Sequence, residues 1–254
     1  MDFLICIDDT DNLESIGTGK LAQILGRKLE ELNLGIMGNI TRHQLLIHPD
    51  IPYTSHNSSM CFDFETERKN WDKIIQICSD FLDTESAQGS DPGLCVASWD
   101  LISEEIVDFG FAAKQIVLKK EDAYNLAKKH NIHLSEHGGT GLGVVGALAG
   151  VGLRFSGKDG KFKSLKGTEN LDGIYIVKDL YEKSQIECVR TLDGKVADED
   201  DEVDLTVAFK VMLMDKKATL LVYADEDSQN SNITRWKAYD KKFLKKLERQ
   251  EQTK

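Results

Sequence analysis

The spacing of apolar residues along the chain follows the two periods expected of strands and helices. A short apolar run, Phe3–Ile7, ends in two aspartates and predicts a buried strand with carboxylates at its C-terminal end. Apolar residues then recur at helical spacing over Lys20–Leu34, and Gly35 is suited to end that helix. The N-terminus is therefore expected to form a strand, a turn and a helix.

The same pattern predicts further elements up to about residue 152. The expected strands are Gln44–Ile47, Ser59–Phe64 and Leu94–Trp99, with a strand end at Lys114–Leu118, and the expected helices are Trp71–Leu82 and Glu121–His130. The stretch Ser135–Gly152 is the most glycine-rich of the chain. It predicts a loop that runs into a helix of small residues from about Val144 to Val151, which is able to pack closely on a neighbouring element.

After Arg154 the pattern becomes typical of β structure. Strands are expected at Ile174–Val177, Ser184–Val189, Val203–Leu213 and Ala218–Tyr223, followed by a charged helix within residues 237–254. The sequence therefore predicts an α/β (α+β) protein with three parts. These are an α/β domain over residues 1–112, a glycine-rich segment over 113–156, and a small β-rich, barrel-like region over 157–254.

Composition and charge narrow the class of protein. The net charge of −11 argues against a general nucleic-acid coat protein, which relies on many Lys and Arg contacts to phosphates. The five cysteines include no CxxC pair, which favours buried reduced thiols over disulfides or a structural zinc site. The sequence shows no signal peptide and no apolar run long enough to span a bilayer, so a cytoplasmic protein without membrane contact is expected.

Three carboxylates crowd the end of the first strand. Asp8, Asp9 and Asp11 lie within four residues and repel one another unless a cation neutralises them. Carboxylate oxygens suit Mg²⁺, which often bridges to substrate phosphates. An acidic turn capped by Asp11 or Asn12 fits the aspartates equally well. If a metal is bound, the three aspartates are its candidate ligands, and Asp8 and Asp9 are candidate catalytic residues.

The turn after the aspartates has the composition of a phosphate-binding loop. Gly17, Thr18, Gly19 and Lys20 precede a helix, where backbone N–H groups and the helix dipole favour an anion. The segment is not a Walker A motif, because the first glycine is missing and Leu21 occupies the Ser/Thr position. The segment is a stronger candidate for phosphate binding because it follows the aspartates closely, at a strand end where open α/β sheets bind ligands.

A second glycine-rich loop is a further candidate for phosphate binding. Gly138, Gly139, Thr140 and Gly141 precede the small-residue helix, and a glycine-packed turn without a ligand is the alternative. Glu136 and His137 beside the loop are candidates for acid–base or metal chemistry, although a single loop histidine is more often an ordinary surface side chain. The order of residues reveals no Ser–His–Asp or Cys–His arrangement.

Three ordered regions, the first of them spanning residues 7–19, resemble the archaeal tRNA-isoleucine agmatinylcytidine synthetase (TiaS) family. Residues 7–12 (IDDTDN) are similar to the family's IDDTDS segment, and Gly17–Gly19 fall where the family has CTT. Residues 51–54 (IPYT) are similar to part of NPNIPYKT, and residues 143–152 to RGLIGALAAIG. The chain is also similar to stand-alone bacterial relatives with DDTDN, GTG and EHGGTG segments.

This resemblance implies a kinase-type domain joined to a ferredoxin-like domain. It also implies that the aspartates bind ATP and Mg²⁺. In the family, a cytidine base is phosphorylated and the phosphate is then displaced by agmatine. A threonine of CTT is autophosphorylated, and Thr18 holds the matching position. The family's OB-fold and zinc ribbon grip tRNA, whereas this sequence has no zinc-ribbon cysteines.

The favoured hypothesis is an ATP/Mg²⁺-dependent kinase or ligase that acts on a small molecule or nucleoside-like acceptor. Two alternatives stay open, a nucleotide-binding sensor without turnover and a tRNA-modifying enzyme with a separate RNA-binding partner. The expected nucleotide is ATP, with GTP as the alternative, and the oligomeric state stays open, a homodimer being one alternative.

Overall fold

The computed structural model describes residues 2–51, 57–225 and 234–251, and it divides into two compact units, residues 1–156 and 157–254. The boundary expected after residue 112 lies inside the first unit, between α3 and α4. Among the described residues, no helix combines the length and apolar character needed to cross a membrane. All five cysteines are buried and free, which confirms the expectation of buried reduced thiols.

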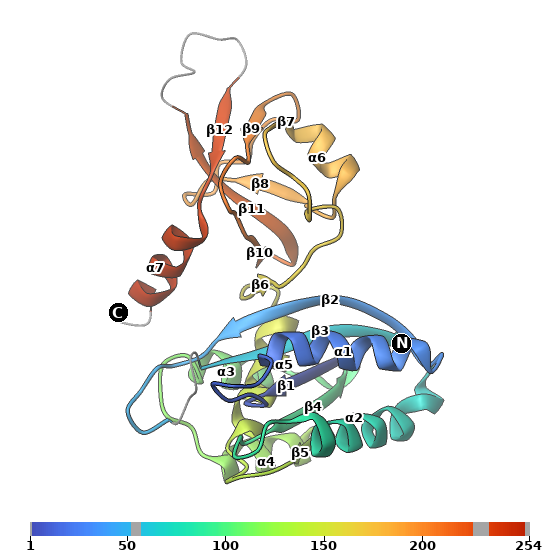
Figure 1. Ribbon diagram of the computed structural model, residues 1–254. Coiled ribbons are helices and arrows are strands. Elements are labelled where there is room, and N and C mark those ends of the chain that lie inside the picture. Colours follow the sequence, from blue (N-terminus) through green and yellow to red (C-terminus); the bar gives the residue numbers. More distant parts are fainter. Residues whose placement is uncertain (1, 52–56, 226–233, 252–254) are drawn as a thin grey trace. The chain divides into compact units, whose positions relative to one another are not determined.

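The first unit is a five-stranded antiparallel sheet covered by helices on both faces (Figure 1). The strands lie in the order β5-β4-β1-β3-β2. Their bounds are β1 Asp2–Asp8, β2 Gly35–Gln44, β3 Ser58–Thr66, β4 Gly93–Ser98 and β5 His133–Glu136. The helices are α1 Thr18–Glu31, α2 Trp71–Glu85, α3 Glu104–Ala112, α4 Lys120–Lys129 and α5 Gly143–Ser156, with 3-10 turns at Arg68–Asn70 and Trp99–Leu101.

Alternation along the central strand divides the core of this unit into two layers. Phe3, Ile5 and Ile7 of β1 pack with α1 and α2, whereas Leu4 and Cys6 pack with α3, α4 and α5. Because successive side chains of a strand point to opposite faces, a strand covered on both sides is apolar throughout. The apolar run at the N-terminus is therefore explained by its central place in the sheet.

The second unit is β-rich and has its own core. Its strands are β6 Lys161–Phe162, β7 Ile174–Ile176, β8 Cys188–Arg190, β9 Glu202–Asp204, β10 Val211–Met214, β11 Lys217–Ala224 and β12 Arg235–Ala238. Strand β11 pairs with β10 and β12 antiparallel and with β8 parallel. The second unit also contains helices α6 (Val177–Lys183) and α7 (Lys241–Glu251).

The mixed α/β fold with a β-rich second part confirms the predicted fold class, while several predicted elements were wrong. The strand expected at Gln44–Ile47 is instead β2, which ends at Gln44. Residues Lys114–Leu118 form a loop rather than a strand end. The single strand expected over Val203–Leu213 is two strands, β9 and β10, because residues 205–210 leave the sheet.

Candidate functional site

The last residue of β1 is directed into the protein. Asp8 pairs in register with Gly93 of β4 and lies under α5, where a Cβ on Gly146 would overlap its carboxylate. Burial, followed by the charge of Asp9, raises the pKa of Asp8 well above its usual value. Asp8 therefore contacts the small-residue helix, and the glycine at position 146 is what admits its carboxyl group.

Asp9 stands where the chain leaves the sheet. Its φ is +49°, a left-handed conformation that Asp and Asn adopt more readily than most residues. Burial raises the pKa of Asp9 to about 6, and the charges of Asp91 and Asp11 add to this shift. Asp9 is thus a half-buried carboxylate with two other acidic side chains close by, and neutralisation by a cation would be favourable.

The beginning of α1 is tied to the same turn by hydroxyl groups. Thr10 Oγ1 donates to Thr18 Oγ1 at 3.1 Å, and Thr18 Oγ1 donates to Asp11 Oδ1 at 3.0 Å. Gly17 is the N-cap, and α1 begins at Thr18 with no acidic residue in its first turn. An anion-favouring helix N-terminus therefore lies beside Asp11, and Thr18 has a hydroxyl whose proton faces a carboxylate.

Gly19 and Lys20 are the remaining residues of the predicted GTGK segment. Gly19 is buried in the first turn of α1. Lys20 is exposed, and its Nζ lies 3.3 Å from Gln23 Oε1 on the same helix. Its long side chain is therefore directed along the surface of α1.

The second glycine-rich loop is held by an aspartate that sequence reasoning missed. Asp91 accepts hydrogen bonds from the Thr140 N–H and from Thr140 Oγ1, the latter at 2.7 Å. Gly138, Gly139 and Gly141 have φ of +150°, +55° and +73°, conformations that explain the glycines. This loop lies near the end of β1, because Asp8 pairs in register with Gly93 and a Cβ on Gly93 would overlap the Gly143 backbone.

A lysine adjoining the loop was also missed. Lys120 Nζ, at the start of α4, lies 2.9 Å from Glu136 Oε2 and 2.9 Å from the Thr140 carbonyl oxygen. The hydrogen bond and charge of Lys120 lower the pKa of Glu136. Glu136, a candidate for acid–base work, is thus an ionised partner of Lys120 and holds the lysine ammonium group beside the loop.

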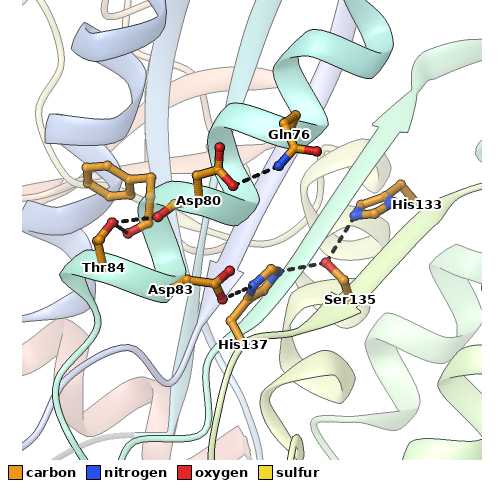
Figure 2. Close-up of polar contacts among 8 residues, drawn as sticks. Gln76, Asp80, Asp83, Thr84, His133, Ser135 and His137 are labelled. Carbon is orange, nitrogen blue, oxygen red and sulfur yellow. Dashed lines mark hydrogen bonds and ion pairs between the residues drawn. The ribbon is translucent and has the colours of Figure 1, made fainter.

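His137 is not the ordinary surface side chain that a lone loop histidine suggests, because its side chain is only 6% exposed. Figure 2 shows it between Ser135 and Asp83, with His133 on the far side of the serine. This chain joins β5 to the end of α2. Asp83 and His137 are 54 residues apart in the sequence, so only the fold reveals their contact.

The arrangement of acidic side chains limits the predicted metal site. Within the described residues, no group of three or more His, Cys, Asp or Glu side chains is arranged to hold a metal ion. Asp8 is turned toward α5, whereas Asp9 and Asp11 are half-buried. The similarity at residues 51–54 falls mostly outside the described ranges, since residues 52–56 are not among them.

The chain is similar in sequence to a known protein over just over half of its length. No protein-family model matches the chain. The chain is 30% identical over 151 residues to the uncharacterised protein MJ0921 of Methanocaldococcus jannaschii, covering 59% of this chain and 49% of that protein. The match thus spans about half the length of that protein.

Solved structures of TiaS are similar to the chain as well. A complex of TiaS with an isoleucine tRNA and ATP, and a structure described as a tRNA fluorescent labeling enzyme, each match at 25% identity and a TM-score of 0.53. Each match covers 60% of this chain and 36% of the other. Apo TiaS matches at 24% identity and a TM-score of 0.51, and this match shows similarity of fold alone. The chain has a TiaS-like fold and spans just over a third of the length of these structures.

Proposed function

We propose that the first unit is an ATP/Mg²⁺-dependent phosphoryl-transfer enzyme, a kinase or ligase that acts on a small molecule or nucleoside-like acceptor. The proposal is supported by the neighbourhood of the aspartates at the end of β1, the N-terminus of α1 and the loop held by Asp91. The similarity to a TiaS complex described as containing ATP supports the same assignment.

The backbone supplies the groups for holding phosphates. The first N–H groups of a helix have no intrahelical partner, and the helix dipole favours an anion there. Gly17 and Gly138 are exposed and leave room for a phosphate at the first turn of α1 and at the second loop, whereas the space beside Gly139 and Gly141 is filled by Asp91 and Glu136. Lys120, bonded to the Thr140 carbonyl, adds a positive charge beside that loop. We expect the phosphates to lie between these two elements.

The donor set fits Mg²⁺ with Asp9 and Asp11 as its protein ligands. Mg²⁺ is usually held by one or two carboxylates together with waters and substrate phosphates, so a cage of three protein ligands is not required. When bound, the ion would neutralise charge on the transferring phosphate. Asp8, buried under α5, is assigned a supporting role in place of direct ligation.

Thr18 is the candidate acceptor for self-phosphorylation. Its hydroxyl already donates to Asp11, so Asp11 is placed to take the proton as Thr18 Oγ1 attacks a γ-phosphate. The Oγ1–phosphorus bond would form as the bond to the β,γ-bridging oxygen breaks, and the nucleoside diphosphate would leave. In such reactions, catalysis rests mainly on positioning and charge neutralisation.

Incubation of the purified protein with ATP and Mg²⁺, followed by intact-mass analysis and an assay for released phosphate, tests the proposal. We expect a phosphate adduct or turnover in the wild type, and loss of both in Asp9→Asn. Nucleotide binding without an adduct, and without turnover across a screen of acceptors, would contradict phosphoryl transfer and favour a nucleotide-binding sensor.

Modification of tRNA is a second candidate, favoured by the similarity to a TiaS structure described as containing tRNA. Binding of tRNA that weakens steeply with salt would support it. The net charge of −11 makes a separate RNA-binding partner the expected source of such affinity.

A further inference from the structure

Four side chains in the first unit form a continuous hydrogen-bonded chain that the proposed nucleotide site does not use. His133 Nε2 lies 3.0 Å from Ser135 Oγ, and Ser135 Oγ lies 2.8 Å from His137 Nε2. His137 Nδ1 lies 2.8 Å from Asp83 Oδ1. Figure 2 shows the side chains pointing toward one another, from β5 and the residue after it on one side and from the end of α2 on the other.

One assignment of the histidine tautomers satisfies all three contacts of this chain. An ionised carboxylate only accepts, so His137 Nδ1 carries the proton that faces Asp83. In this tautomer His137 Nε2 is an acceptor, and the Ser135 hydroxyl donates to it. The remaining contact requires His133 Nε2–H to donate to Ser135 Oγ. Burial and the neighbouring His137 lower the pKa of His133, which favours this neutral donor form.

Ser135, His137 and Asp83 thus have the connectivity of a Ser–His–Asp triad, in which one imidazole nitrogen contacts the serine and the other contacts the aspartate. His137 is held in one orientation, since its side chain is 6% exposed and its backbone N–H donates to the Pro92 carbonyl oxygen at 2.8 Å. Asp83 is 61% exposed, so the relay opens to solvent at one end.

The strand that carries the serine, β5, stands at one end of the strand order. Ser135 and His133 pair in register with Leu94 and Val96 of β4. Ser135 and His133 are only half-buried. A triad here requires that an acyl group reach the half-buried Ser135 at this end of the sheet.

We propose that Ser135, His137 and Asp83 form a nucleophilic triad that acts on an ester or a related acyl electrophile, with His133 as the donor to the developing oxyanion. Ser135 Oγ forms a bond to the electrophilic carbon while its proton passes to His137 Nε2. His137⁺ stays bonded to Asp83, and the carbonyl electron pair becomes an oxyanion beside His133 Nε2–H. On collapse, the leaving group departs with its electron pair and takes the proton from His137, and water hydrolyses the acyl-serine by the same relay.

The test is covalent labelling of the full chain by an alkyl fluorophosphonate, without nucleotide, followed by peptide mapping. The Oγ–phosphorus bond forms, the phosphorus–fluorine bond breaks, fluoride leaves with the electron pair, and the serine proton passes to His137. We expect one adduct, on Ser135. Because no nucleotide is present, the outcome is independent of the proposed phosphoryl transfer.

Variants separate a triad from a merely structural hydrogen-bond chain. Labelling should be absent in Ser135→Ala and His137→Gln and at least about tenfold slower in Asp83→Asn, which disturbs the imidazole tautomer. Asp80→Asn is the matched control, because Asp80 is on the same helix but bonds Gln76 at 2.7 Å. Thermal melting establishes that each variant is folded. A folded wild type that is unlabelled at Ser135, or an Asp83→Asn variant labelled as fast as wild type, would overturn the proposal.

Discussion

Replacing Asp9 by Asn should make the protein more stable near neutral pH, which is the opposite of the usual effect of a mutation. The folded-state pKa of this carboxyl is raised from the usual 3.8 to about 6, first by burial and then by the charges of Asp91 and Asp11. Asn accepts the left-handed backbone at this position, where φ is +49°, so the substitution adds no backbone strain. Its main effect is to remove an unfavourable charge.

The size and sign of the effect follow from the shift. Between pH 4 and pH 6 the native state binds more protons at Asp9 than the unfolded state does, so its contribution to stability falls as pH rises. At about 1.36 kcal/mol per pKa unit, the full shift corresponds to roughly 3 kcal/mol. Since Asp9 is only half-buried, solvent screening reduces the expected cost to about 1.5 kcal/mol, fully present above pH 6 and absent below pH 4.

Urea unfolding of wild type and Asp9→Asn at pH 4, 5, 6 and 7.5 measures this cost. The variant should be about 1.5 kcal/mol more stable at pH 7.5, and the difference should vanish at pH 4. Asp108→Asn on the exposed face of α3 is the control and should show no such pH dependence. A destabilised Asp9→Asn at pH 7.5, or a difference that is the same at every pH, would refute the reasoning.

Three further predictions concern the elements around Asp9. Gly93→Ala should destabilise the protein by about 1–3 kcal/mol in urea unfolding, because its Cβ would overlap the Gly143 backbone, which no side-chain rotation relieves. Gly17→Ala is the tolerated counterpart, since the nearest atom to its Cβ is 3.5 Å away; equal losses from the two would argue against close β4–α5 packing. Asp91→Ala should speed amide hydrogen exchange in residues 138–143 without a comparable change in β1, and unchanged exchange there would mean that Asp91 does not order the loop. Thr18→Ala should abolish self-labelling by γ-labelled ATP, and labelling as strong as in wild type would exclude Thr18 as the acceptor.

The parts of the fold that could be predicted are those whose pattern is local. β1, α1, α2 and α5 have apolar runs or helical spacing over many residues, and each was placed within a few residues of its observed bounds. β5 was missed because it is a polar strand at the end of the sheet order, with only one apolar residue, Leu134, among its four. β2 was shifted because Gly35, which suggested only a helix end, is also its first residue.

The candidate site shows the same limit. The aspartates of β1 and the helix that follows are close in sequence, so their proximity could be predicted. The partners of the second loop could not, because Asp91 lies 49 residues before Thr140 and Lys120 lies 20 residues before it. The contact between Asp83 and His137 likewise depends on how α2 packs beside β5. Residue order carries no information about such pairs until the sheet brings them together.

Calorimetric titration of ATP into the protein, with and without Mg²⁺, tests most directly whether the end of β1, the start of α1 and the second loop form one nucleotide site. Wild type should bind ATP saturably in the presence of Mg²⁺, and Asp9→Asn, although folded, should lose the dependence of that binding on Mg²⁺. The absence of binding by wild type, or the same Mg²⁺-dependent binding in the variant, would contradict the account.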